Sequence, residues 1–278
     1  MGIALQQFEY LRKLVRDHSA IVIDHDKQYL AESRLASIAV ETACSSVDDL
    51  LVRLRSEPFQ AMHGKVLEAM TNNETWFFRD LGPFQALEKQ IIPQLLERRA
   101  RQRKLRFWSA AASSGQEPYS IAMLLHSHFA LPSWTYEIHA TDISSAILER
   151  ARLGRYSQME INRGLPAALL ARYFHQHGLH WLIDAGIKQA VTFQLLNLSQ
   201  PWPAMEAYDV IFLRNVLIYF DLETRRKILA KIRRVLQPDG FLILGCAESM
   251  LSLDASYERL TFGTTTYYRP KGKVQSHD

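Results

Sequence analysis

The chain has 278 residues and is 47% hydrophobic, which is enough apolar material for one medium-sized domain and a second, smaller one. Its formal net charge of +4 is the small difference between 33 basic and 29 acidic residues, so the composition does not indicate a nucleic-acid-binding protein. No segment approaches the ~20 apolar residues that a membrane-spanning helix needs, so direct membrane insertion is not expected.

The cysteines and the amino-terminal segment predict a reduced, cytoplasmic protein. Cys44 and Cys246 lie too far apart in the sequence to form a recognisable disulfide or metal motif. Residues 1–20 carry charges and lack the apolar core of a signal peptide.

Residues 8–70 are predicted to form a small helical domain. Their apolar residues recur three and four positions apart, as at Phe8, Leu11 and Leu14, and no convincing strand is present. A further helical stretch, residues 84–99, is interrupted by Pro93 and leads into the next domain. We therefore place the boundary near position 83, with residues 1–83 in the helical part and 84–278 in the larger domain.

Residues 105–142 have the pattern of a strand, a loop, a helix and a second strand. Residues 105–108 are mostly apolar, the sequence around Gly115 permits a tight turn, and Pro118 suits the first turn of a helix. Apolar and polar residues then alternate up to Asp142, which should end a strand. A carboxylate at that position can accept hydrogen bonds from both ribose hydroxyls of a cofactor. A dinucleotide fingerprint needs three glycines, so a phosphate-free adenosine cofactor such as S-adenosylmethionine fits better.

Strands and helices continue to alternate after Asp142. Residues 191–195 and 208–213 are strand-like, Asp221 can cap a helix with one apolar stripe, and a Pro-Asp-Gly turn at 238–240 precedes a last strand. This alternation predicts a doubly wound α/β sheet. Ligands of such sheets bind beyond the carboxyl ends of the strands, so the polar residues that follow the predicted strands should converge there. These are residues 113–117, Asp142, Asn197, Arg214 and Asn215.

Two dense basic runs, residues 97–106 and 225–234, are interpreted as solvated faces. The alternative is electrostatic steering toward an acidic protein surface. The histidines at 175, 177 and 180 could in principle bind zinc, but they have no helical i,i+4 pair and are interpreted as part of a polar connection. We predict no metal site.

The chain resembles the chemotaxis receptor methyltransferases of the CheR family over nearly its whole length. The resemblance rests on the segments KQYLAESRL, TNNETWFFRD, WSAAASSGQEPYSIA, FLRNVLIYF and LQPDGFLILGCAES, which occur in that order. It implies a class I methyltransferase-like sheet with a small β-subdomain at about residues 157–190, preceded by an all-α domain. It also implies a protein-glutamate O-methyltransferase that uses S-adenosylmethionine to methylate the cytoplasmic helical region of chemoreceptors. The products would be glutamate methyl esters and S-adenosylhomocysteine, formed for adaptation in chemotaxis.

The resemblance assigns roles to particular residues. It makes Arg79, together with Tyr219 near the transferred methyl group, the candidate catalytic residues. Gln116 stands where many relatives have a second glutamate, so Glu117 alone is expected to hold the amino group of the cofactor. The implied cofactor-binding residues are Asn73, Thr75 and Arg79 in a closing segment, Glu117, Asp142 at the ribose, Asn197 and Leu198 at the adenine, and Arg214 with Asn215.

Most of these residues also have a plain structural interpretation, and two other functions stay open. The chain could methylate another acceptor, or it could be a silent module that binds the cofactor without turnover. The structural alternatives are an ordinary turn at Gly115, a helix start at Asp142, a solvated ion pair of Arg79 with Asp80 or Glu74, a helix cap at Asn73 or Thr75, and core packing of Tyr219 and Phe220.

The resemblance also leads to expectations about partners. Relatives that bind a receptor's carboxyl-terminal pentapeptide have a longer, glycine-richer loop than residues 175–183 provide, so we expect methylation without that tether. Arg53 and Arg55 are candidates for contact with acidic receptor side chains, with solvated surface as the alternative. We expect a monomer.

Overall fold

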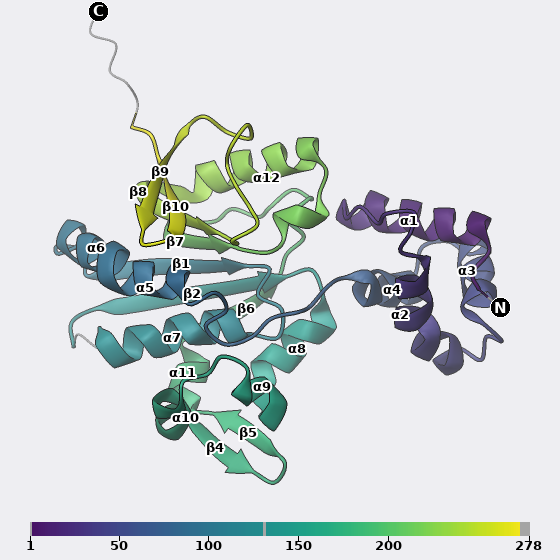
Figure 1. Ribbon diagram of the computed structural model, residues 1–278, viewed down its shortest axis with the longest axis horizontal. Coiled ribbons are helices and arrows are strands. Elements are labelled where there is room, and N and C mark those ends of the chain that lie inside the picture. Colours follow the sequence, from purple (N-terminus) through teal and green to yellow (C-terminus); the bar gives the residue numbers. More distant parts are fainter. Residues whose placement is uncertain (1, 130–131, 273–278) are drawn as a thin grey trace, which may run out of the picture.

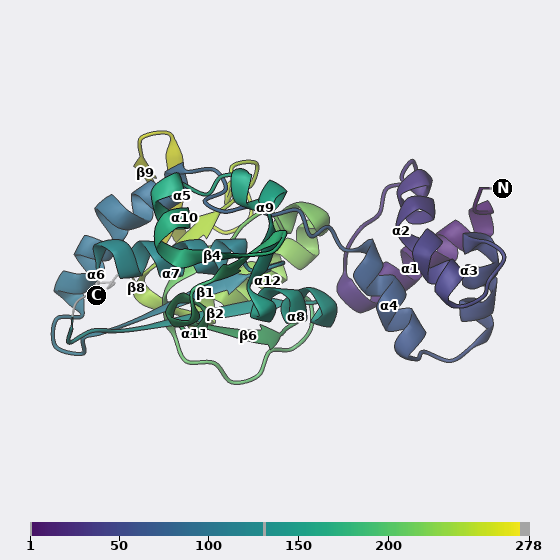
Figure 2. The same ribbon diagram turned by 90° about the horizontal axis from the view of Figure 1, so that it is seen from below.

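The computed structural model describes residues 2–129 and 132–272. The predicted helical domain is present as α1 (Leu5–Ser19), α2 (Gln28–Glu41), α3 (Val47–Ser56) and α4 (Ala61–Met70). Its core is separate from that of the rest of the molecule and includes Phe8, Leu35 and Val66, all fully buried. Two perpendicular views show this helical domain beside one end of the sheet, not on a sheet face (Figure 1, Figure 2).

Within the part of the chain that the structure describes, the larger sheet has seven strands in the order β6-β2-β1-β7-β8-β10-β9. Strands β6 to β8 in that order are parallel, and β10 and β9 add an antiparallel edge. The doubly wound prediction is confirmed, whereas the edge hairpin was not predicted. The bounds are β1 (Lys104–Ala110), β2 (Thr135–Asp142), β6 (Val191–Leu195), β7 (Tyr208–Leu213), β8 (Leu236–Leu244), β9 (Tyr257–Phe262) and β10 (Thr265–Pro270).

Both faces of this sheet are covered by helices, and the side chains of β1 alternate between them. Leu105 and Phe107 pack in the core that includes α7 (Gln116–His128) and α8 (Ser145–Leu153). Trp108 and Ala110 pack in the core on the side of α12 (Leu222–Val235). Parallel strands buried on both faces in this way are typical of α/β folds.

Local departures from the predicted elements follow from proline and glycine. The stretch before β1 is α5 (Gly82–Ala86), a π-helical turn η1 (Leu87–Ile91) and α6 (Ile92–Arg98), so the chain stays helical through Pro93. Proline has no N–H to continue the regular ladder, which is consistent with the wider turn just before it. The turn predicted at residues 238–240 is instead an irregularity inside β8, between the pairs Tyr208–Leu236 and Val210–Phe241.

A small subdomain lies between α8 and β6. It comprises β3 (Arg155–Ser157), α9 (Gln158–Asn162), α10 (Ala167–Tyr173), β4 (Phe174–His177), β5 (His180–Ile183) and α11 (Ala185–Gln189). Its antiparallel sheet has the order β3-β5-β4. The segment interpreted as a polar connection is therefore a hairpin, in which His177 pairs with His180 around a turn at Gly178. Across the described residues, no group of three or more His, Cys, Asp or Glu side chains is arranged to hold a metal ion.

The first basic run, residues 97–106, was interpreted as a solvated face. This interpretation is wrong for Arg99 and Arg106, whose side chains are largely buried. The Arg99 side chain is 15% exposed and pairs with Asp209 at 2.9 Å and Asp239 at 2.6 Å. The Arg106 side chain is 12% exposed and pairs with Glu137 at 2.9 Å. The ion pair with Arg99 lowers the pKa of Asp239, whereas burial raises the pKa of Asp209. These arginines fasten helix α6 and strand β1 to the neighbouring strands.

None of the helices in the described ranges is both long enough and apolar enough to cross a bilayer.

Candidate active site

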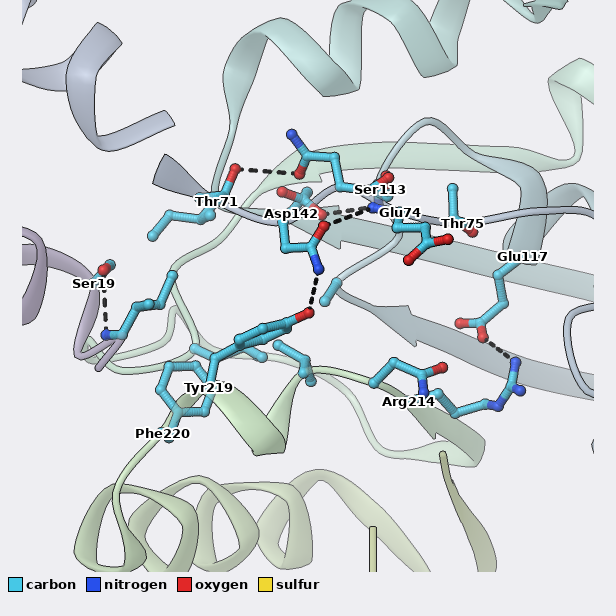
Figure 3. A pocket seen from close by; sticks show the side chains of 18 of the residues that line it. Ser19, Thr71, Glu74, Thr75, Ser113, Glu117, Asp142, Arg214, Tyr219 and Phe220 are labelled. Atoms are coloured by element: carbon cyan, nitrogen blue, oxygen red, sulfur yellow. Dashed lines mark hydrogen bonds and ion pairs between the residues drawn. The ribbon is translucent and has the colours of Figure 1, made fainter. Parts of the chain in front are cut away.

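A cavity lies where the carboxyl ends of β1, β2, β6 and β7 meet the helical domain (Figure 3). The space between its lining residues is about 860 Å³, which includes open solvent at its mouth. The residues to which the family resemblance assigned a role all line this cavity, whereas Ser114, Gly115 and Gln116 of the predicted 113–117 segment do not. Those with an assigned role are Asn73, Thr75, Arg79, Glu117, Asp142, Asn197, Leu198, Arg214, Asn215 and Tyr219.

Asp142 is the last residue of β2, and its carboxylate is held in place by backbone groups. One oxygen accepts from the N–H of Ser113 at 2.8 Å, and the other accepts from the N–H of Ser144 at 3.1 Å. Burial raises its pKa, against the opposing effect of these hydrogen bonds. Helix α8 is capped by the Ser144 hydroxyl, which accepts from Ile147 N–H at 3.2 Å, so Asp142 is not its cap. Each carboxylate oxygen keeps a lone pair for a ligand.

Arg214 is a buried centre of charge beside the cavity, with a side chain only 1% exposed. Its Nη1 donates to Glu117 at 2.8 Å, and its Nη2 donates to the Asp80 carboxylate at 2.9 Å and to the Arg79 carbonyl at 2.8 Å. Glu117 also accepts from the Ser109 hydroxyl at 2.7 Å. The closing segment is thus tied through Asp80 and Arg79 to the carboxyl end of β7.

Arg79 does not form the ion pair considered from the sequence. Its Nη1 donates to the backbone carbonyl of Glu74 at 2.8 Å, and its guanidinium lies 4.3 Å from the ring centre of Trp76. The Glu74 carboxylate pairs instead with Arg163 at 2.6 Å, which lowers its pKa. Among the described residues, the buried Nε atoms of Arg79 and Arg214 have no hydrogen-bond acceptor. The oxygens of a carboxylate bound in the cavity are acceptors of the kind that such donors require.

Tyr219 is half buried and directs its hydroxyl into the cavity (Figure 3). The Asn72 side chain donates to this hydroxyl at 2.6 Å. Phe220, next to it, is buried in the core. The sequence reasoning missed Asn72, although it stands in the TNNET segment directly before Asn73.

The helical domain closes one side of the cavity through Ser19 and Ile21. Asn197 connects the two domains, since its Nδ2 donates to the carbonyl of His18 at 2.7 Å. A backbone hydrogen bond from Val22 N–H to the Tyr219 carbonyl, at 2.9 Å, adds a second connection. The wall beside the Asn197 and Leu198 pair is therefore contributed by both domains.

Glu68, on α4, is a further residue that sequence reasoning missed. Its carboxylate accepts from the N–H and hydroxyl of Ser145, at 3.0 and 2.9 Å, and from the Ser144 hydroxyl at 3.0 Å. It thus meets the positive amino-terminal end of α8, immediately after Asp142. No periodicity could reveal a contact between residues 77 positions apart.

Gln116, where the family pattern was expected to differ, points away from the cavity. Its side-chain oxygen accepts from the Ser114 hydroxyl at 2.7 Å, and its amide lies 3.4 Å from Glu160 on α9. Within the described residues that line the cavity, Glu117 supplies the carboxylate at this position. The substitution therefore affects contact with the small subdomain rather than the cavity.

The groups around the cavity suit an adenosine cofactor with an amino acid tail. Asp142 provides acceptors for ribose hydroxyls, and the free Nε atoms of the two arginines provide donors for a carboxylate. The turn at residues 113–115 has a single glycine, so a pyrophosphate cradle of the dinucleotide type is not formed. The residues therefore fit S-adenosylmethionine.

Comparison with known families agrees with this chemistry. Residues 73–266 match the family model described as CheR methyltransferase, SAM binding domain, so the larger domain is that of an S-adenosylmethionine-dependent methyltransferase. Residues 6–71 match the model described as CheR methyltransferase, all-alpha domain. The chain belongs to the CheR methyltransferase family. The predictions of family, enzyme class and cofactor are confirmed.

Individual relatives align over almost the whole chain. Chemotaxis protein methyltransferase 1 of Pseudomonas aeruginosa is 36% identical over 276 residues, which cover 98% of this chain and 100% of the relative. Chemotaxis protein methyltransferase Cher2 of Pseudomonas putida is 35% identical over 269 residues, covering 95% and 98%. Chemotaxis protein methyltransferase of Vibrio parahaemolyticus is 34% identical over 273 residues, covering 97% and 98%.

Proposed function

We propose that this enzyme methylates glutamate side chains in the cytoplasmic helical region of chemoreceptors, for adaptation in chemotaxis. The products are glutamate methyl esters and S-adenosylhomocysteine. The observation that carries the proposal is the cavity between the two domains, which gathers residues of three of the five family-like segments, TNNETWFFRD, WSAAASSGQEPYSIA and FLRNVLIYF, around one space. The names of the relatives, which are chemotaxis protein methyltransferases, support the same substrate class.

The cofactor-binding roles follow from the donors and acceptors of each residue. When bound, S-adenosylmethionine supplies an electrophilic methyl group on a sulfonium sulfur. We assign Asp142 to the ribose hydroxyls, and Asn197 with Leu198 to the adenine side. Glu117 provides a carboxylate for an amino group, held in position by Arg214 at 2.8 Å. Asn73, Thr75 and Arg79 belong to the segment that covers the cofactor, and Asn215 also lines the cavity.

The reaction needs no general base from the protein. A glutamate side chain has a pKa of about 4.3 in solution and is already an anion at neutral pH. The task of the site is alignment in a cavity that excludes water. Arg79 lines the cavity, where its positive charge can orient the glutamate carboxylate, and Tyr219 is fixed by Asn72 with its hydroxyl facing the cavity. A single guanidinium contact orients the nucleophile without neutralising it fully.

Mass spectrometry of receptor fragments tests the proposal. Fragments incubated with the enzyme and cofactor should carry the added methyl on glutamate side chains of their helical region. Methyl groups found on other residue types, or on a small molecule instead of the receptor, would contradict it.

We further propose that the enzyme acts without a receptor pentapeptide tether, as a cytoplasmic monomer. The β4–β5 turn is short, with His177 paired to His180 across it. The exposed Arg53 and Arg55 on α3 are the proposed contacts with acidic receptor side chains. Micromolar binding of such a pentapeptide in calorimetry would contradict methylation without a tether. A dimer in sedimentation would contradict the monomer. Unchanged methylation after charge reversal of both arginines would contradict their contact with the receptor.

A further inference from the structure

The loop that follows β8 contains a carboxylate with an unusual set of partners. Glu248 accepts hydrogen bonds from consecutive backbone N–H groups of the loop after β7 and from its own loop. Oε2 accepts from Asn215 at 2.7 Å and Gly245 at 2.8 Å, and Oε1 accepts from Leu217 at 2.7 Å, Val216 at 2.9 Å and Ile218 at 3.4 Å. Converging backbone N–H groups form a concave site for an anion, and here the anion is part of the same chain.

The segment held by Glu248 carries residues assigned to the cofactor cavity. Asn215, at its start, lines the cavity and has a left-handed φ of 56°. Tyr219, at its end, lines the cavity with its hydroxyl on Asn72. A non-glycine residue with a left-handed φ persists only where its surroundings hold it. Glu248 provides that hold, because its bonds to Asn215 and the next residues bear on that stretch of backbone.

The loop after β8 and the loop after β7 also approach each other closely, which is a second observation that the contact of Glu248 is a specific feature of the fold. Gly245 lies against Asn215 so tightly that an added Cβ would be 2.7 Å from Asn215 Nδ2 and 2.9 Å from its backbone nitrogen. The same Cβ would be 2.8 Å from Glu248 Oε2. Glycine at this position therefore lets the carboxylate and the loop meet.

We infer that Glu248 is a positioning residue for the methyl-transfer site, which acts by holding Asn215 and Tyr219 in place. Glu248 does not line the cofactor cavity, and its role is exerted through the backbone of residues 215–218. Charge-assisted hydrogen bonds are stronger than neutral ones, so a carboxylate fixes this segment better than an amide can. The inference rests on the proposed function of the cavity as the cofactor site.

Glu248→Gln tests the inference. One carboxylate oxygen of Glu248 is replaced by the Nε2 amide group of glutamine, which is a donor and cannot accept from the backbone N–H groups. We expect the dissociation constant of S-adenosylhomocysteine to rise about tenfold, and kcat to fall at saturating cofactor. Hydrogen exchange of the amides at 215–218 should become faster, while amides of β7 and β8 keep their rates. Gly245→Ala disturbs the same contact by another route and should give the same pattern.

Glu223→Gln is the matched control, because Glu223 lies on α12 with a side chain 77% exposed and pairs only with Lys227 among the described residues. It should leave affinity, kcat and local exchange unchanged. If the unaltered enzyme does not bind S-adenosylhomocysteine, the proposed cofactor site is wrong. If it binds and the folded Glu248→Gln and Gly245→Ala variants bind equally well with unchanged kcat, the inference about Glu248 is overturned. If Glu248→Gln does not fold, Gly245→Ala alone decides between these results.

Discussion

At the scale of single residues, the site depends on side chains that the fold has already oriented. Asp142 is held by two backbone N–H groups, Glu117 by Arg214 and Ser109, and Tyr219 by Asn72. Little reorganisation is needed for such groups to meet a ligand, which is the basis of positional catalysis. The same contacts make specific changes at these positions informative.

Cofactor affinity should depend on pH through Asp142. Burial raises the pKa of this carboxyl above its ordinary value of 3.8, so it takes up a proton at a less acidic pH than an exposed aspartate. Only the ionised group offers both oxygens as acceptors, so affinity should fall as the pH is lowered through the raised pKa. Calorimetry with S-adenosylhomocysteine, from neutral pH down to the most acidic pH at which the enzyme stays folded, measures this dependence.

Asp142→Asn is the control for that titration. It should bind more weakly by about 2 kcal/mol and should lose the acid-dependent decrease. An affinity that changes with pH in the same way in both proteins would assign the titration to another group.

Tyr219 and Asn72 should act as a unit. Tyr219→Phe removes the hydroxyl and should lower kcat about tenfold with little change in KM for the cofactor, because alignment in the cavity is lost. Asn72→Ala should produce a similar decrease, and the double variant should be little worse than either one. Steady-state kinetics of the three variants give the coupling; fully additive effects would show that the hydrogen bond between them has no part in turnover.

At the scale of elements, the periodicity of the sequence predicts much of the sheet. It predicts only some of the contacts that form the site. The strand ending at Asp142 and the helix capped by Asp221 were predicted because their patterns are local. The β9–β10 hairpin and the contacts of Glu68 and Glu248 were not. Apart from the bond of Glu248 to Gly245 in its own loop, those contacts join residues 30 or more positions apart in the chain, which no local pattern encodes. The family resemblance supplied the site residues that periodicity could not.

The contact between α4 and the start of α8 should hold the helical domain against the ribose side of the cavity. Glu68→Gln would remove the negative charge from the positive end of α8 and should weaken this docking by about 1 kcal/mol. We expect faster hydrogen exchange at residues 144–146 and weaker binding of S-adenosylhomocysteine. Glu41→Gln, on α2, is the control because Glu41 pairs with Lys65 at 3.8 Å on the surface. Equal effects of both substitutions would contradict the proposed docking role.

At the scale of the whole molecule, the cavity is formed jointly by two domains with separate cores. Ser19 and Ile21 come from the helical domain, Asn72 and Arg79 from the segment between α4 and α5, and Asp142 from the sheet. A ligand that bridges these parts stabilises their docked arrangement by the free energy of its binding. Cofactor binding is therefore expected to stabilise the docked position of the helical domain.

The central claim is that the methyl group is transferred to a carboxylate of a chemoreceptor. The most direct measurement uses methyl-labelled S-adenosylmethionine with receptor cytoplasmic fragments, followed by mild alkali and collection of volatile methanol. Because methyl esters are hydrolysed under these conditions and methylated amines are not, we predict that the protein-bound label is released as methanol. Label that remains on the protein after alkali would contradict the account.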